Sequence, residues 1–171
     1  MSAAGPSFLA RIEPLVDRLI GPVRKRRLIH RWFMLRRGMT LGVRAAVLDG
    51  AGRVFLVRHA YIEGWHLPGG GVERGQSARA ALEAELREEA NIELTMEPAL
   101  FALYHNARAA PRDHVALYIV RAFEQRGERM PDHEILEARF FPLNALPEGV
   151  TESTRKRLGE IAGVAPVPPE W

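Results

Sequence analysis

The chain has 171 residues, 47% of them hydrophobic, which is enough to bury the core of one domain of ordinary size. It contains no cysteine, which excludes disulfides and thiolate metal sites and makes a reducing cytoplasm the expected location. No apolar run approaches the ~18 residues that a membrane-spanning helix needs, and the N-terminus lacks a signal-peptide pattern, so neither a transmembrane segment nor export is expected.

The net charge of +3 hides an uneven distribution. Residues 18–48 contain no acidic side chain and nine basic ones, namely Arg18, Arg24, Lys25, Arg26, Arg27, Arg31, Arg36, Arg37 and Arg44. The rest of the chain carries 15 basic against 21 acidic residues, a balance of −6. Such a basic segment either binds an anionic partner, such as RNA, a phosphate-rich substrate or a membrane surface, or packs against the acidic body of its own chain.

The first residues are interpreted as a helical and basic N-terminal arm, residues 1–38. Within it, residues 7–20 space their apolar side chains as one face of a helix, which Pro14 interrupts. The connector that follows, residues 21–38, interleaves apolar and basic residues and is typical of an extra strand or a surface arm. We place the main domain at residues 39–165 and a proline-rich tail at residues 166–171.

The main domain begins with a strand pattern at residues 40–49, a turn at residues 49–52 and a second strand pattern at residues 53–60, which together predict a β-hairpin. Two further strands are expected at residues 99–107 and 114–124, joined by a polar turn at residues 110–113. Another strand is expected at residues 135–143, and a closing helix at residues 151–163 with Thr151 or Ser153 as its N-cap. These elements predict a mixed α/β domain in which helices pack on a mainly antiparallel sheet.

Between the predicted strands lies a helix framed by Ser77 as N-cap and Asn91 as a left-handed C-cap. Its last turns carry Glu85, Glu88 and Glu89, where negative charge opposes the helix dipole by roughly 0.3–1 kcal/mol per group. One interpretation is a solvated acidic helix end. The other is a divalent metal site, because carboxylates and the carbonyls of the bare glycine loop at residues 67–71 are the oxygen ligands that Mg²⁺ or Mn²⁺ prefers.

The segment from Gly70 to Ile92 resembles the signature of the Nudix hydrolases, a glycine, a glutamate and an Arg-Glu-apolar-any-Glu-Glu core at fixed spacing. The resemblance extends over residues 39–147, including the flanking WHLPGG and EARFFPL segments. Three positions depart from the pattern: Gln76 replaces the first glutamate, Ala84 the arginine and Asn91 the last glycine. Asparagine is the best substitute for glycine in a left-handed cap, whereas the other two changes remove a supporting acid and base together.

The resemblance implies an α+β sandwich, in which a mixed, mainly antiparallel sheet lies between helices, and hydrolysis of the pyrophosphate of a nucleoside diphosphate linked to another group. Nucleotide sugars, ADP-ribose and nucleoside triphosphates are all substrates of this type. It also implies Mg²⁺ or Mn²⁺ as cofactor, and homodimers are common in the family. Four residues are expected at the metal, namely Gly69 through its carbonyl, Glu85, Glu88 and Glu89. The expected catalytic residues are Glu85, Glu88 and Glu134, the last being preferred to Glu137 as the base from a later loop.

Substrate contacts are expected from Arg44, Arg58, Trp65 and Gly70. The two arginines alternate with apolar neighbours on strands and can reach phosphates, or they form ordinary ion pairs. Trp65 can stack on a base, or it packs under the glycine loop. Two other functions stay open: the domain is a catalytically weak or inactive module that binds a ligand or RNA, or the basic arm binds RNA while the domain trims a 5′ pyrophosphate.

Overall fold

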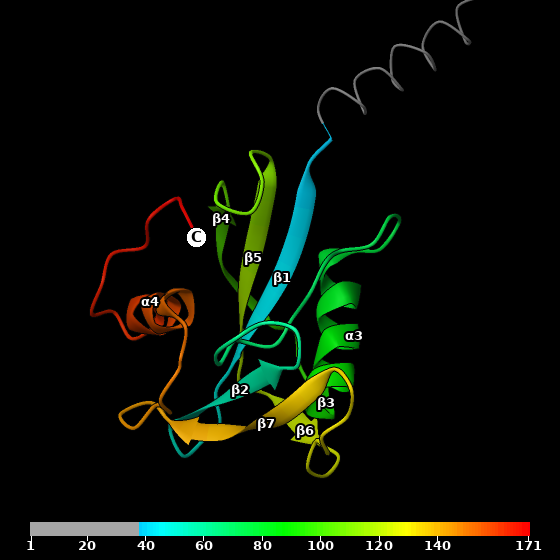
Figure 1. The fold of residues 1–171 in the computed structure, drawn as a ribbon, viewed down its shortest axis with the longest axis vertical. Helices are drawn as coiled ribbons and strands as arrows, with labels where there is room; N and C mark the ends of the chain where they lie inside the picture. Colours follow the sequence, from blue (N-terminus) through cyan, green and yellow to red (C-terminus); the bar gives the residue numbers. More distant parts are fainter. Residues whose placement is uncertain (1–37) are drawn as a thin grey trace, which may run out of the picture. The chain divides into compact units, whose positions relative to one another are not determined.

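The computed structural model describes residues 38–171, and Met39–Trp171 forms one compact unit (Figure 1). The helical stripe and most of the basic arm predicted above lie outside the described residues. In chain order the elements are β1 (Thr40–Val47), β2 (Arg53–His59), α3 (Ala78–Ala90), β3 (Ile92–Leu94), β4 (Ala99–His105), β5 (Asp113–Val120), β6 (Phe123–Gln125), β7 (Ile135–Pro142) and α4 (Glu152–Ile161).

The strands form three sheets that combine parallel and antiparallel pairing. β1 pairs with β5 in parallel, and β5 pairs with β4 in the antiparallel sense, so β5 lies at the centre of a three-stranded sheet. β2 pairs with β7, and β3 with β6, both antiparallel. The predicted mixed and mainly antiparallel α/β fold is therefore confirmed.

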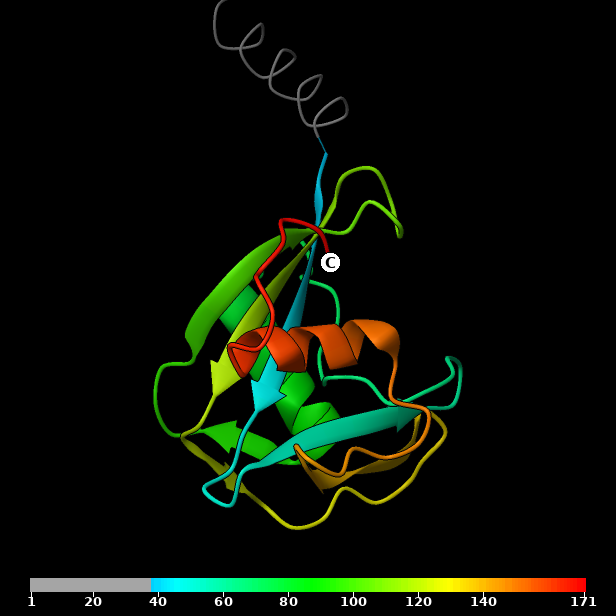
Figure 2. The same ribbon diagram turned by 90° about the vertical axis from the view of Figure 1, so that its left-hand side faces the viewer.

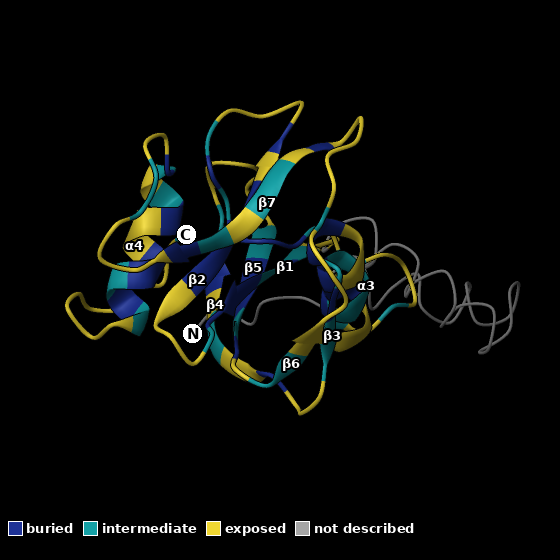
Figure 3. Ribbon diagram, turned by 90° about the horizontal axis from the view of Figure 1, so that it is seen from below, coloured by how far each residue is buried: buried dark blue, intermediate teal, exposed yellow. Residues whose placement is uncertain are grey.

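Helices α3 and α4 cover opposite faces of the strands (Figures 1 and 3). Alternating side chains of β1 and β2, such as Val43 and Phe55, pack with Leu82 and Leu86 of α3. The intervening side chains of the same strands pack in a second cluster with Leu158 of α4. Because both faces are buried, these strands read as nearly continuous apolar runs rather than as a simple alternation of apolar and polar residues.

The predicted hairpin between β1 and β2 is wrong beyond its turn. The turn itself forms, with the amide of Asp49 donating to the Arg53 carbonyl at 3.0 Å, but only the isolated bridge between Leu48 and Val54 joins the two strands. The strands then diverge, β1 to β5 and β2 to β7. Local turn chemistry predicts the turn, whereas strands buried on both faces take their partners from the packing of the whole core.

The strand predicted at residues 114–124 is also interrupted. It breaks after Val120 into β5 and β6, and β6 pairs with β3, a strand that follows α3 directly and that the pattern did not reveal. Both new strands are only three residues long, too short for a visible period.

Helix α3 begins and ends where its predicted caps place it, and α4 begins at one of its two predicted caps but ends at Ile161, before the expected residue 163. Ser77 accepts a hydrogen bond from the amide of Ala80, and Asn91 has a left-handed backbone with φ of 53°. Thr151 rather than Ser153 caps α4, by accepting from the amide of Thr154. The glutamates of α3 are therefore placed on the last turns of a helix whose two ends are fixed.

The chain ends in a tail that packs on the domain (Figure 2). The amide of His105 donates to the Pro169 carbonyl at 2.8 Å, and the amide of Trp171 donates to the His105 carbonyl at 3.0 Å. The Trp171 ring lies edge-on to Tyr104, with centroids 5.4 Å apart. In the part of the chain that the structure describes, no helix is long and apolar enough to cross a membrane.

Candidate active site at the acidic end of α3

The glycine loop approaches β1 and α3 so closely that Gly69 has no room for a side chain and a side chain at Gly70 would displace a carboxylate. A Cβ on Gly69, whose φ is 139°, would clash with the carbonyl of Val43. A Cβ on Gly70 would clash with the carboxylate of Glu85. The loop is held by the amide of Val43, which donates to the Gly70 carbonyl at 2.9 Å. Gly70 thus allows the backbone to touch a carboxylate of the helix.

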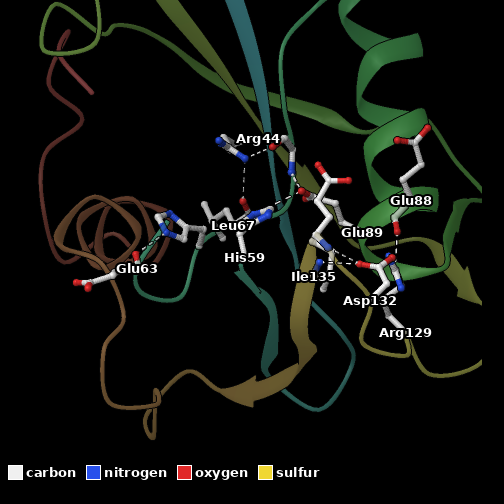
Figure 4. A network of polar contacts seen from close by, with 12 residues as sticks. Arg44, His59, Glu63, Leu67, Glu88, Glu89, Arg129, Asp132 and Ile135 are labelled. Atoms are coloured by element: carbon white, nitrogen blue, oxygen red, sulfur yellow. Dashed lines mark hydrogen bonds and ion pairs between the residues drawn. The ribbon is translucent and has the colours of Figure 1, made fainter. Parts of the chain in front are cut away.

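Glu89 is the most buried of the three helix carboxylates, with 8% of its surface exposed (Figure 4). One oxygen accepts from the amide of Gly69 at 2.8 Å, and the other lies 3.4 Å from His59 Nε2. Burial raises the pKa of Glu89 to about 7, and burial together with the charge of Arg44 lowers the pKa of His59 to about 4. His59 is therefore neutral at neutral pH, and its contact with Glu89 is not an ion pair.

A cavity of about 240 Å³ gathers four glutamates, beside Asp132, from two distant parts of the sequence. Glu85, Glu88 and Glu89 line it from α3, and Glu134 lines it from the segment before β7. The pKa of Glu85 is raised by burial and by the negative charge of Glu88. The structure thus brings together all the glutamates that the sequence nominated for metal binding and catalysis.

The sequence did not reveal the arginine and aspartate that hold Glu134 in place. Arg129 donates through Nε to the Glu88 carbonyl at 2.6 Å and pairs with Asp132, and both residues line the cavity (Figure 4). Asp132 accepts from the amides of Glu134 and Ile135, each at 2.8 Å. These amides, together with Arg129, hold the pKa of Asp132 well below its usual range. An aspartate that accepts from the amides two and three residues later forms a local turn that a sequence can suggest. The contact of Arg129 with the Glu88 carbonyl joins distant segments and is visible only in the fold.

The donor set fits a hard divalent cation, because it consists of carboxylates beside a bare backbone. The fit is one of ligand type: within residues 38–171 no three His, Asp or Glu side chains converge on one point. The carboxylates repel one another, and Glu89 accepts a hydrogen bond from the amide of Gly69. The glutamate side chains must therefore rotate to place their oxygens on one ion. A cation at this place would favour the ionised carboxylates and so lower the raised pKa values of Glu85 and Glu89.

Arg44 lies at the site, but its guanidinium binds the glycine loop. Its Nη1 donates to the carbonyl of Gly69 and lies 3.4 Å from that of Leu67 (Figure 4). The Gly69 carbonyl, expected beside the metal, therefore has Arg44 as a partner in this structure. A carbonyl oxygen has two lone pairs, so this hydrogen bond leaves one acceptor position.

Arg58 and Trp65 lie outside the carboxylate cavity. Arg58 pairs with Glu137 at 3.2 Å across β2 and β7, as an ordinary ion pair of the strand surface. Trp65 is only 6% exposed, and its ring packs edge-on against Phe141 with centroids 4.7 Å apart. Trp65 is thus a core residue, and the expectation that it stacks on a base is corrected: the large apolar ring is buried against α4 and β7 instead.

The departures from the family pattern have local replacements in two of three cases. The side chain of Gln76 accepts from the amide of Glu73 at 3.0 Å and so closes the turn before α3. Asn91 takes the left-handed cap, and its side-chain amide donates to the Glu128 carbonyl at 3.0 Å. Ala84 has no such replacement from Arg79 of the same helix, which pairs with Glu83 and Glu97.

Comparisons with known proteins agree with this geometry. Residues 38–160 match the NUDIX domain family. An ADP-ribose pyrophosphatase of Methanocaldococcus jannaschii is 33% identical over 82 residues, which is 48% of each chain, so the match spans about half the length of that relative. A MutT NUDIX hydrolase of Burkholderia pseudomallei has a similar solved structure, with a TM-score of 0.60 and 26% identity over 71% of this chain and 97% of its own. An ADP-ribose pyrophosphatase of Streptococcus suis has a TM-score of 0.55 and 26% identity, over 75% of this chain and 94% of its own.

Proposed function

This chain belongs to the Nudix family, and we propose that it is a metal-dependent pyrophosphohydrolase acting on a nucleoside diphosphate that is linked to another group. The observation that carries the proposal is the single cavity in which Glu85, Glu88, Glu89 and Glu134 meet. Asp132 is a fifth carboxylate of the cavity and pairs with Arg129, the only positive group among the lining residues, so the four glutamates are costly unless a cation joins them.

We infer that Glu85, Glu88 and Glu89, with the Gly69 carbonyl, hold Mg²⁺ or Mn²⁺. When bound, such an ion stabilises the charge that develops on phosphoryl oxygens during hydrolysis. Glu134, exposed at the edge of the cavity, accepts the proton of the attacking water. Arg129 and Asp132 keep Glu134 at that position, and Arg129 adds a positive charge to the wall of the cavity in which the phosphates bind.

ADP-ribose is the first substrate to test, because two of the similar proteins described above are ADP-ribose pyrophosphatases. Nucleotide sugars and nucleoside triphosphates present the same linkage and belong in the same panel. We propose a cytoplasmic location, in keeping with the lack of cysteine.

The experiment is a hydrolysis assay with Mg²⁺ or Mn²⁺, in which chromatography resolves the products. The panel contains ADP-ribose, nucleotide sugars, dinucleoside polyphosphates, nucleoside triphosphates and 5′-triphosphorylated RNA. We expect metal-dependent release of a nucleoside monophosphate, which Glu89→Gln abolishes. Glu83→Gln is the matched control, since Glu83 is on the same helix but pairs with Arg79 outside the cavity.

No turnover of any substrate, with ligand binding intact, would refute the proposal and favour the alternative of a Nudix-fold binding module. Salt-sensitive binding of RNA that depends on the nine basic residues would support the RNA interpretation instead.

A further inference from the structure

Three large apolar side chains are exposed around one pocket beside the carboxylate cavity. Tyr61 is 70% exposed, Ile62 49% and Leu136 42%. With residues 58–60, Glu63 and Gly64 they line a cavity of about 320 Å³, here called the Tyr61 pocket. Single exposed apolar residues are ordinary, but several around one cavity of this size are typical of a ligand site.

The loop that carries Tyr61 and Ile62 is anchored at both ends. Before it, the amide of Ala60 donates to the Glu134 carbonyl at 2.9 Å. After it, the amide of Trp65 donates to the Gly149 carbonyl at 3.0 Å. The exposed side chains therefore stand on a fixed backbone, which lowers the entropic cost of binding a ligand.

The Tyr61 pocket adjoins the candidate active site through His59. This buried side chain lines the pocket, its ring centroid lies 5.1 Å from that of Tyr61, and its Nε2 lies 3.4 Å from the carboxylate of Glu89. Two consecutive residues of β7 line the two cavities: Ile135 lines the carboxylate cavity and Leu136 lines the Tyr61 pocket.

We propose that the Tyr61 pocket binds the nucleobase of the nucleotide whose phosphates bind at the carboxylates, an inference that rests on the proposed function. A nucleobase presents a flat aromatic face, which stacks on the Tyr61 ring, while Ile62 and Leu136 cover its apolar surface. Trp65, the aromatic residue nearest the glycines in the sequence, is buried and does not serve this role.

This assignment has a consequence for specificity. The Tyr61 ring stacks on the face of a base, whereas Arg58, His59 and Glu63 line the same pocket as polar groups. Stacking is available to every base. We therefore expect a nucleotide of any base to bind more tightly than a base-free pyrophosphate.

The test compares wild type with Tyr61→Ala, Tyr61→Phe and Leu103→Ala, the last a control at an exposed apolar residue on β4. Steady-state kinetics are measured with ADP-ribose and with 5-phosphoribosyl 1-pyrophosphate, which carries a pyrophosphate but no base. Calorimetry measures binding of AMP and of ribose 5-phosphate. This second measurement does not require turnover.

We expect Tyr61→Ala to raise the KM for ADP-ribose and the Kd for AMP about tenfold, the effect of losing one base–aromatic stack. The kcat should change less than twofold, Tyr61→Phe should behave as wild type, and base-free ligands should be unaffected. Equal weakening of base-containing and base-free ligands, or no change in either, would overturn the inference. If AMP binding depends on Tyr61 but the protein shows no turnover, the base pocket is supported and the proposed hydrolase is refuted. If the protein shows neither AMP binding nor turnover, both proposals are refuted.

Discussion

Glu160 and Arg157 form a buried ion pair on α4, and we predict that neutralising Glu160 destabilises the domain. Arg157 is 1% exposed and Glu160 5%, and the Nη2–Oε1 distance is 2.5 Å. The second carboxylate oxygen accepts from the Tyr104 hydroxyl at 2.7 Å. Glu160→Gln keeps the volume and an acceptor for Tyr104, but it removes the negative charge that faces Arg157.

The expected loss is about 3 kcal/mol, because removing one partner of a buried ion pair leaves a charge without compensation at a cost of roughly 3–5 kcal/mol. The lower value applies because the guanidinium keeps its hydrogen bond to the Glu170 carbonyl at 3.2 Å and its contact with the Tyr104 ring. For a domain of this size the loss lowers Tm by about 10 °C. Glu152→Gln is the matched control, since Glu152 also pairs with a basic residue of α4, Lys156 at 2.6 Å, but both side chains are more than half exposed.

Thermal unfolding followed by circular dichroism and calorimetry measures both variants at neutral pH. We expect Glu160→Gln to unfold well below Glu152→Gln, and the double variant Arg157→Met/Glu160→Met to recover part of the loss by removing both charges. Unfolding of the two glutamine variants within about 2 °C of each other would refute the argument, because burial would then not decide the energy of the pair.

Three further predictions concern the site. Without metal, two effects on the stability of the wild type oppose each other between pH 7 and 5. The raised pKa values of Glu89 and Glu85 add stability as pH falls, and the lowered pKa of His59 removes stability below about 6.5. Urea unfolding in EDTA should therefore show His59→Gln gaining stability and Glu89→Gln losing it as pH falls, and parallel curves would contradict the assignment. Arg129→Ala should lower kcat about 10- to 100-fold by releasing Glu134, with partial recovery in Arg129→Lys, whereas unchanged kcat in both would exclude this positioning role. Trp65→Ala should lower the free energy of unfolding by roughly 3–5 kcal/mol, measured in urea, and a pure rise in KM with normal stability would restore the stacking interpretation.

The sequence alone determined the local features of this protein. Ser77 and Asn91 cap α3 because their side chains and backbone satisfy the free groups at helix ends, which depends on residues a few positions away, whereas the sequence left Thr151 and Ser153 open as the cap of α4. The spacing of the three glutamates on α3, after a loop of glycines, identified the candidate site, because positions three and four residues apart lie close together on a helix. The predicted elements gave the mixed α/β class and the family resemblance agreed with it, and the sheet arrangement and the match over residues 38–160 confirm both.

Only the tertiary structure decided which distant segments meet. The pairing of β1 with β5 rather than β2, the burial of Trp65 and the contact of Arg129 with Glu88 all join residues far apart in the chain. None of these contacts leaves a periodic or turn signal, because each depends on the packing of the whole core rather than on neighbours in sequence. The same packing holds Tyr61 in an exposed position beside the carboxylates while it buries the tryptophan four residues later.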